Sequence, residues 1–335
     1  MLIMVGIFVF SFLLFKLRLF PRIINGPKEL TVPSVNNIRQ VFSEKPGFVL
    51  SETNKHGYAS LTTAEIWKKL LLGFEKGEKV QVYLENELIE RLRNEPDSPV
   101  YKELLSLFRQ GSLPNFAQQV LVSILGQVGN FKSAEALMSL VNENLLNEPD
   151  VKLVAFNAIS QFSPESRLEH SSAELAPVFE IAWQTDNSEY WPSIANVMAS
   201  IGTPSTLDVF TKTLTDNTDP KRVEIVKQAM TSLSNPDLVP KLAASLENPE
   251  NENVLLASGN ALANIGNSDA TSALLEWSAQ ANTEKAALVK EWFETAMNTT
   301  PEFIDYLKIN LTEQKFESPE IKQAVQELLK NVKSQ

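Results

Sequence analysis

Histidine and cysteine, the side chains that most often bind metals or act as bases and nucleophiles, are scarce in this sequence. The 335-residue chain has no cysteine and only two histidines, His56 and His170, which lie 114 residues apart. The lack of cysteine excludes disulfides, thiolate metal sites and cysteine nucleophiles. An imidazole triad or a two-histidine metal site would need both histidines to meet by a long-range coincidence. We therefore predict no metal site and no cofactor.

Short motifs for phosphate, dinucleotide or hydrolytic chemistry are also missing. The sequence contains no G-x-x-x-x-G-K-[ST], G-x-G-x-x-G, G-x-S-x-G or H-E-x-x-H. The run Asp216–Asp219 lacks the D-x-D-x-D-G pattern of a calcium loop and fits better as the N-cap before Pro220. Carboxylates are plentiful, but no spacing brings a specific acid–base pair together. We expect no catalytic residue and predict that the chain is not an enzyme.

Aromatic side chains are the remaining candidates for molecular recognition. Trp183, Tyr190 and Trp191 lie close together in the segment AWQTDNSEYWP, and Trp277 lies further along the chain. Tryptophan and tyrosine are common anchors of protein interfaces, so all four residues are candidate partner-binding positions. The alternative is local packing of a wide helical unit, and composition alone does not separate the two roles.

The charge is unevenly distributed. The chain has a net charge of −11, and 43% of its residues are hydrophobic, so it can bury a sizeable core. Residues 1–28 contain four basic residues and no acidic one, which leaves a net charge of −15 on the remainder. Such an acidic body repels phosphate backbones, and we do not expect it to bind nucleic acid.

The amino terminus resembles a membrane anchor. Residues 1–15 carry no charge, and Lys16 and Arg18 can snorkel so that the apolar helix extends to Phe20. No small-x-small cleavage site follows, so an uncleaved anchor over residues 1–22 fits better than a cleaved signal peptide. The flanking basic residues favour a cytoplasmic body at a bacterial inner membrane. A basic region missing upstream would reverse that orientation.

Helical periodicity begins at Thr62. Residues 23–61 are rich in proline and are expected to form a stalk or an irregular cap. Thr62 and Glu65 form a capping box before an apolar run, and residues 62–113 are predicted to be a helical N-terminal cap. Residues 114–335 are predicted to be a repeat array.

The array consists of pairs of apolar helices joined by short turns. The last four turn residues follow one another at intervals of 32 residues, and six turns in all fit a period near 32. The residue just before each turn is apolar, and so is the residue four positions earlier. Residues four positions apart lie on one face of a helix, so these two columns predict a buried stripe. Prolines are expected to open the first helices at Pro114, Pro149, Pro220, Pro249 and Pro319. The predicted turn residues are Gly129, Ser163, Gly202, Ser234, Gly266 and Asn298.

Segments such as DPKRVEIVKQAMTSL and EPDVKLVAFNAISQF resemble the first helix of a HEAT repeat. The resemblance covers about two-thirds of the chain, from Pro114 to Gln335, and implies an all-α, right-handed α-solenoid of HEAT-like helical hairpins. The residues independently indicate helix pairs that bury their apolar faces only by stacking on their neighbours. An armadillo or tetratricopeptide array is the alternative architecture.

Trp277 differs from the residues at the equivalent position of the other repeats, which we call its column. It lies eleven residues after its turn, where other units carry Leu140, Thr213 and Ser245. An isolated tryptophan in a small or polar column predicts an exposed contact, with packing against the neighbouring helix as the alternative.

The resemblance implies a membrane-anchored scaffold or adaptor that binds a protein partner on a curved helical surface. The alternative function is that of an envelope-associated accessory protein, which binds a small molecule or polysaccharide in the concavity. A catalytic HEAT-like protein is a third hypothesis, which fold resemblance alone cannot support.

Deletion of residues 1–22 tests the anchor. We expect the truncated chain to be soluble and folded, because the later helices are amphipathic rather than uniformly apolar. The measurement is the distribution of full-length and truncated chains between washed membranes and supernatant. A truncated chain that still pellets with the membranes would reveal a second membrane determinant.

Overall fold

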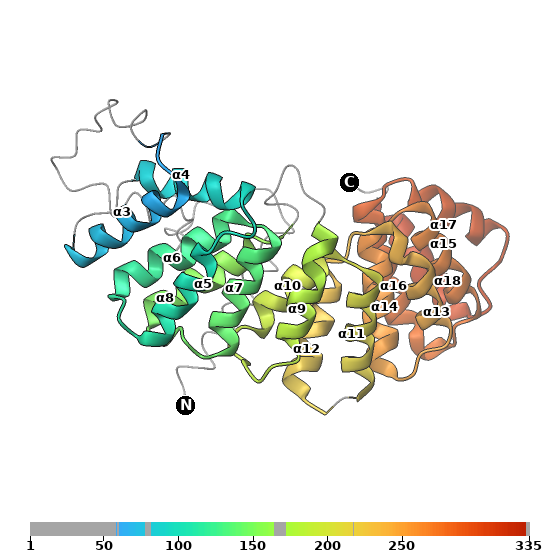
Figure 1. Cartoon of the computed structure of the whole chain (residues 1–335). Helices are drawn as coiled ribbons and strands as arrows, with labels where there is room; N and C mark the ends of the chain where they lie inside the picture. Colours follow the sequence, from blue (N-terminus) through green and yellow to red (C-terminus); the bar gives the residue numbers. More distant parts are fainter. Residues whose placement is uncertain (1–57, 59, 78–81, 164–171, 217, 333–335) are drawn as a thin grey trace, which may run out of the picture. The chain divides into compact units, whose positions relative to one another are not determined.

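The computed structural model describes residues 58, 60–77, 82–163, 172–216 and 218–332. All the described residues belong to one compact unit, Ser51–Gln335. These residues form sixteen α-helices and no strand, so the all-α prediction is confirmed for this part of the chain (Figure 1). The helices are α3 (Thr63–Glu75), α4 (Val82–Asn94), α5 (Val100–Gln110), α6 (Asn115–Val128), α7 (Phe131–Asn142), α8 (Pro149–Ser160), α9 (Ala176–Trp183), α10 (Trp191–Ile201), α11 (Pro204–Asp216), α12 (Pro220–Met230), α13 (Val239–Glu247), α14 (Glu252–Ile265), α15 (Ser268–Gln280), α16 (Ala286–Thr299), α17 (Phe303–Thr312) and α18 (Pro319–Val332). Short 3₁₀ helices precede three of them: η3 (Ser172–Leu175), η4 (Pro236–Leu238) and η5 (Thr283–Lys285).

The predicted capping box opens helix α3. The Thr62 backbone N–H donates to Glu65 Oε2 at 2.7 Å, and the Glu65 N–H donates to Thr62 Oγ1 at 3.3 Å. These two bonds satisfy donors that the first turn of a helix leaves unpaired. The hydrogen bonds from Thr62 to the carboxylate lower the pKa of Glu65.

Three predicted glycine turns adopt the left-handed conformation. Gly129, Gly202 and Gly266 have φ angles of 70°, 60° and 62° and end helices α6, α10 and α14. Glycine is favoured there because a Cβ atom would be strained at positive φ. Ser163 and Ser234 lie between helices, as predicted, whereas Asn298 lies in the last turn of α16.

One of the predicted helix boundaries is wrong. Pro249 does not open helix α14, because Asn251 is the N-cap and accepts a hydrogen bond from the Val254 N–H at 3.0 Å. In the turn after α16, the Thr300 hydroxyl donates to the backbone oxygen of Gly266 in the preceding pair, so this side chain joins two pairs.

Successive helix pairs pack on one another through corresponding helices. The first helices α6, α8, α10, α12, α14, α16 and α18 contact one another in that order. Among the second helices, α7 contacts α9, α9 contacts α11 and α13 contacts α15. Corresponding helices of successive pairs thus lie side by side (Figure 1), which is consistent with a helical repeat.

The predicted apolar stripe is buried between the pairs. Ile124, Val197, Ala229, Ala261 and Phe293 are each no more than 1% exposed. Burial of this stripe removes apolar surface from water, at about 25 cal/mol per Å². The column next to the turns is less uniform, because its members in the last two pairs, Ile265 and Met297, are only partly buried.

Two glycines allow first helices to approach closely. A Cβ atom built on Gly126 would lie 2.7 Å from the Ala158 Cα atom, so α6 and α8 leave no room for a larger residue. A Cβ atom on Gly259 would lie 2.0 Å from the Trp292 Cζ2 atom, so this glycine makes space for the indole of α16.

Several sequence predictions fall outside the described residues. The anchor (residues 1–22), most of the stalk (residues 23–61), His56 and His170 are among them. Within the described segments, no helix combines the length and the apolar character needed to cross a membrane. That finding does not test the predicted anchor.

The space at Gly259 predicts a stability effect. We expect Gly259→Ala to destabilise the protein by about 1–3 kcal/mol, because the new methyl group overlaps the buried Trp292 ring. Gly73 is a matched control, because it is helical and a Cβ atom there has no neighbour within 4 Å. Gly73→Ala should stabilise the helix by about 0.5–1 kcal/mol. Equal melting temperatures for the two variants would contradict this account of the α14–α16 contact.

Candidate binding groove

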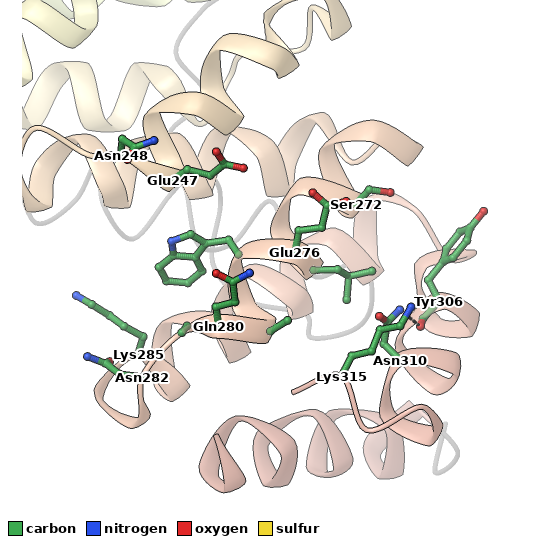
Figure 2. A pocket seen from close by; sticks show the side chains of 14 residues that line it. Glu247, Asn248, Ser272, Glu276, Gln280, Asn282, Lys285, Tyr306, Asn310 and Lys315 are labelled. Carbon is green, nitrogen blue, oxygen red and sulfur yellow. Dashed lines mark hydrogen bonds between the residues drawn. The ribbon is translucent and has the colours of Figure 1, made fainter. Parts of the chain in front are cut away.

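An open groove lies over the second helices near the carboxyl end of the described chain. Its volume is about 1010 Å³, and its walls come from the end of α13, from α15 with the linker that follows, and from α17 (Figure 2). Nine of its fourteen lining residues have charged, amide or hydroxyl side chains besides the phenol of Tyr306. The groove is lined by Glu247, Asn248, Ser272, Leu275, Glu276, Trp277, Ala279, Gln280, Ala281, Asn282, Lys285, Tyr306, Asn310 and Lys315.

Trp277 is the one predicted aromatic candidate that lines this groove. Its side chain is partly buried, and its ring centroid lies 5.1 Å from that of Trp292. Trp292 is itself buried and donates its indole N–H to Asn260 Oδ1 at 2.7 Å. Trp277 therefore rests on a fixed neighbour while part of its surface faces the groove. Both alternatives, an exposed contact and packing against the neighbouring helix, describe part of its environment.

Helix α17 adds an exposed apolar rim that the sequence analysis missed. Tyr306 and Ile309 are 51% and 52% exposed, and Tyr306 lines the groove. The two residues are three positions apart, so they lie on the same side of the helix. Ile309 occupies the same repeat column as Trp277, 32 residues later, which is the signal that would have identified it.

Several polar groups in the groove have no internal partner. The side chains of Glu247, Asn248 and Gln280 are exposed and make no hydrogen bond within the described part of the chain. Asn282 stands at the N-cap position of η5 but makes no side-chain cap bond. By contrast, Asn251 uses its side chain both to cap α14 and to donate to the Leu214 oxygen at 2.8 Å. The groove thus offers donors and acceptors to a ligand.

The two lysines of the groove are already paired. Lys285 lies 3.5 Å from Glu252, and Lys315 lies 2.8 Å from Glu313. Among the described residues, Glu247 and Glu276 have no such cationic partner. The uncompensated charge on the groove is therefore negative.

The other predicted aromatic candidates lie in the core, away from this groove. Trp183 and Trp191 are 1% and 6% exposed, with ring centroids 6.0 Å apart. The Arg222 guanidinium lies 4.1 Å from the Trp191 ring centroid and 5.4 Å from that of Trp183. Arg222 also donates to the Thr185 backbone oxygen at 2.9 Å. These contacts favour the packing alternative for both tryptophans.

Tyr190 is also buried and packs against Phe156, with ring centroids 4.8 Å apart. Its hydroxyl group has no hydrogen-bond partner, and burial raises the pKa of the phenol. An uncharged phenol in this position adds apolar contact area rather than a recognition group. The structure thus brings Trp183, Tyr190 and Trp191 together, but places them apart from Trp277.

The groove combines aromatic surface with polar side chains. No group of three or more acidic or histidine side chains in the described segments is placed to hold a metal ion. Flat aromatic surface, free amides and free carboxylates can recognise a ligand that carries both apolar and polar groups.

Unfolding measurements on single variants test whether Trp183 and Trp191 belong to the core and Trp277 to the groove. We expect Trp183→Ala and Trp191→Ala to cost about 3–5 kcal/mol each, because both remove buried indoles. Trp277→Ala should cost less, about 1–2 kcal/mol, because its ring is only partly buried. Thermal unfolding monitored by circular dichroism measures the losses. An equally large loss for Trp277→Ala would assign this residue to the core as well.

Comparisons with known proteins do not identify the chain. No protein-family model matches it, and no curated protein sequence matches it significantly. The resemblance to HEAT repeats therefore rests on the sequence columns alone.

Proposed function

We propose that the chain is a membrane-anchored scaffold or adaptor that binds a protein partner through a helical-repeat surface. The observation that carries this proposal is the open groove, in which Trp277 and Tyr306 offer aromatic surface beside free polar groups. Aromatic side chains contribute much of the binding energy in protein interfaces. The lack of catalytic motifs in the sequence supports a role without chemistry.

The architecture proposed for this surface is a right-handed α-solenoid of HEAT-like hairpins. Contacts between corresponding helices of successive pairs support it. So do hydrogen bonds that join residues about one repeat apart, such as Asn235 to the Gly202 oxygen over 33 positions. Repeats that contact only their neighbours form extended surfaces suited to large partners.

The proposed location is the cytoplasmic side of a bacterial inner membrane. The uncharged run of residues 1–15 and the basic residues after it support an anchor over residues 1–22. An anchor of this kind would hold the acidic repeat body near membrane partners.

A small molecule or polysaccharide is the second candidate ligand. The specific observation in its favour is the polar lining, with free amides at Asn248, Gln280 and Asn282. Sugar hydroxyls both donate and accept hydrogen bonds, as amides do. The exposed apolar rim at Tyr306 and Ile309 favours a protein partner instead.

The double substitution of Trp277 and Tyr306 by alanine tests the proposed function. We expect a protein that co-purifies with the full-length chain in mild detergent to be lost from the double variant, by at least tenfold. The physical reason is the loss of both aromatic contact surfaces from the groove.

Ile181→Ala provides the control, because Ile181 is 66% exposed on α9 and is not a lining residue of the groove. It should retain the partner. Equal recovery of the partner by the double variant would refute the groove as the contact surface, and a retained glycan or small molecule would favour the second candidate.

A further inference from the structure

The open groove has an internal counterpart two repeats earlier in the chain. A cavity of about 80 Å³ lies beside Trp183 and Arg222, between α9, α11 and the start of α12. Six of its nine lining residues correspond to lining residues of the open groove when the numbering is shifted by 64 positions, or twice 32. These six residues are Trp183, Gln184, Lys212, Thr213, Asp216 and Thr218. The two cavities are therefore the same structural position in different repeats.

In the earlier repeat, the chain fills this position with its own arginine. The Arg222 guanidinium lies over the Trp191 and Trp183 rings at 4.1 and 5.4 Å. One of its nitrogens donates to the Thr185 oxygen, whereas its buried Nε has no hydrogen-bond partner. Cation–π contacts of this kind favour a guanidinium over other cations.

In the later repeat, the residues that fill the position are replaced. Ala286 stands where the earlier repeat has Arg222, so the internal cation is missing. Glu247 replaces Trp183, and Trp277 replaces Thr213, so that the aromatic and polar positions are exchanged. The result is an open groove that retains an aromatic surface and gains a free carboxylate.

We propose that an arginine side chain on an extended segment of the partner protein occupies this open groove, in the role that Arg222 has in the earlier one. Its guanidinium lies against the exposed part of Trp277 and pairs with Glu247. This inference rests on the proposed function, since it names the chemistry of the partner's contact segment.

The charges and amides of the groove support this occupant. Lys285 and Lys315 are paired with glutamates, so they leave Glu247 and Glu276 to attract a cation. A guanidinium forms two parallel hydrogen bonds with a carboxylate, which an ammonium group cannot do. The free side-chain amides of Asn248 and Gln280 are suited to backbone groups of an extended segment, because they both donate and accept.

Two pools of nonapeptides test the proposal on the full-length protein in mild detergent. One pool has arginine at the central position and random flanking residues; the other has citrulline there, which keeps the shape of arginine but not its charge. We expect the immobilised protein to retain at least ten times more of the arginine pool. Equal retention of the two pools would overturn the proposal.

Substitution of Ala286 by arginine recreates the internal occupant. Ala286→Arg should reduce retention of the arginine pool at least tenfold, because the new guanidinium competes for Glu247. Ala287→Arg is the matched control, since it adds the same charge at an exposed neighbouring position outside the lining of the groove. Retention that is unchanged by Ala286→Arg, or reduced equally by both variants, would contradict the proposed site.

Glu247→Gln gives a second test that does not depend on fitting a larger side chain. Glu247 is exposed, so the variant should keep its melting temperature and still lose most of the retention. Competition by free spermidine distinguishes an arginine on a peptide from a free polyamine as the cation that the groove binds. If spermidine displaces the arginine pool but an excess of arginine peptide of fixed sequence does not, the ligand of the groove is a polyamine rather than a peptide. That result would overturn the proposal.

The outcomes are distinguishable from failure of the proposed function. If the co-purifying protein depends on Trp277 and Tyr306 while the two peptide pools are retained equally, the scaffold role stands and the arginine contact is wrong. If the arginine pool is retained in a Glu247-dependent manner while the double aromatic variant keeps its co-purifying protein, the groove binds arginine but is not the surface that holds that protein, and the proposed function fails.

Discussion

Burial between neighbouring helix pairs is the constraint on which this structure depends. A single pair leaves its apolar stripe exposed, and only the next pair covers it, as the buried Ala229 and Ala261 show. The contacts between α6 and α8 and between α14 and α16 are close enough to need glycine at Gly126 and Gly259. Each pair therefore limits the size of the side chains that its neighbour can place at the contact.

Polar side chains set the register between the pairs. Asn130, Asn235 and Asn251 each donate to a backbone oxygen 33 to 38 positions earlier, at 2.8–2.9 Å. Each also accepts a hydrogen bond from a backbone N–H of its own helix start. Because these groups are partly buried, leaving them unpaired would cost about 1–3 kcal/mol each, so the bonds favour one register over others.

The sequence predicts the fold better than it predicts the groove. The helices and the glycine turns follow from local signals, such as the Thr62–Glu65 capping box and the positive φ of Gly202. The exposure of an aromatic residue is not local, because it depends on what the neighbouring pair places opposite. Trp183 and Trp191 are buried by each other and by Arg222, which comes from a different helix pair.

The comparison of equivalent repeat positions supplies what local patterns lack. The exchange between Trp183 and Glu247, and between Thr213 and Trp277, is visible once the 32-residue period is applied to the sequence. Its meaning becomes clear only from the structure, where Arg222 fills one position and Ala286 leaves the other open.

The surface of this chain can thus differ from one helix pair to another while the packing of the helices stays the same. The stripe and the turns remain in place from pair to pair, while the residue at the start of a first helix, Arg222 in α12 and Ala286 in α16, decides whether a guanidinium fills the groove from within. An alanine in place of the partly buried arginine removes an internal cation, and a carboxylate in place of a tryptophan adds an attraction for an external one. Because the neighbouring pairs already hold the aromatic surface in position, the proposed arginine would meet a preorganised site and would lose less entropy on binding.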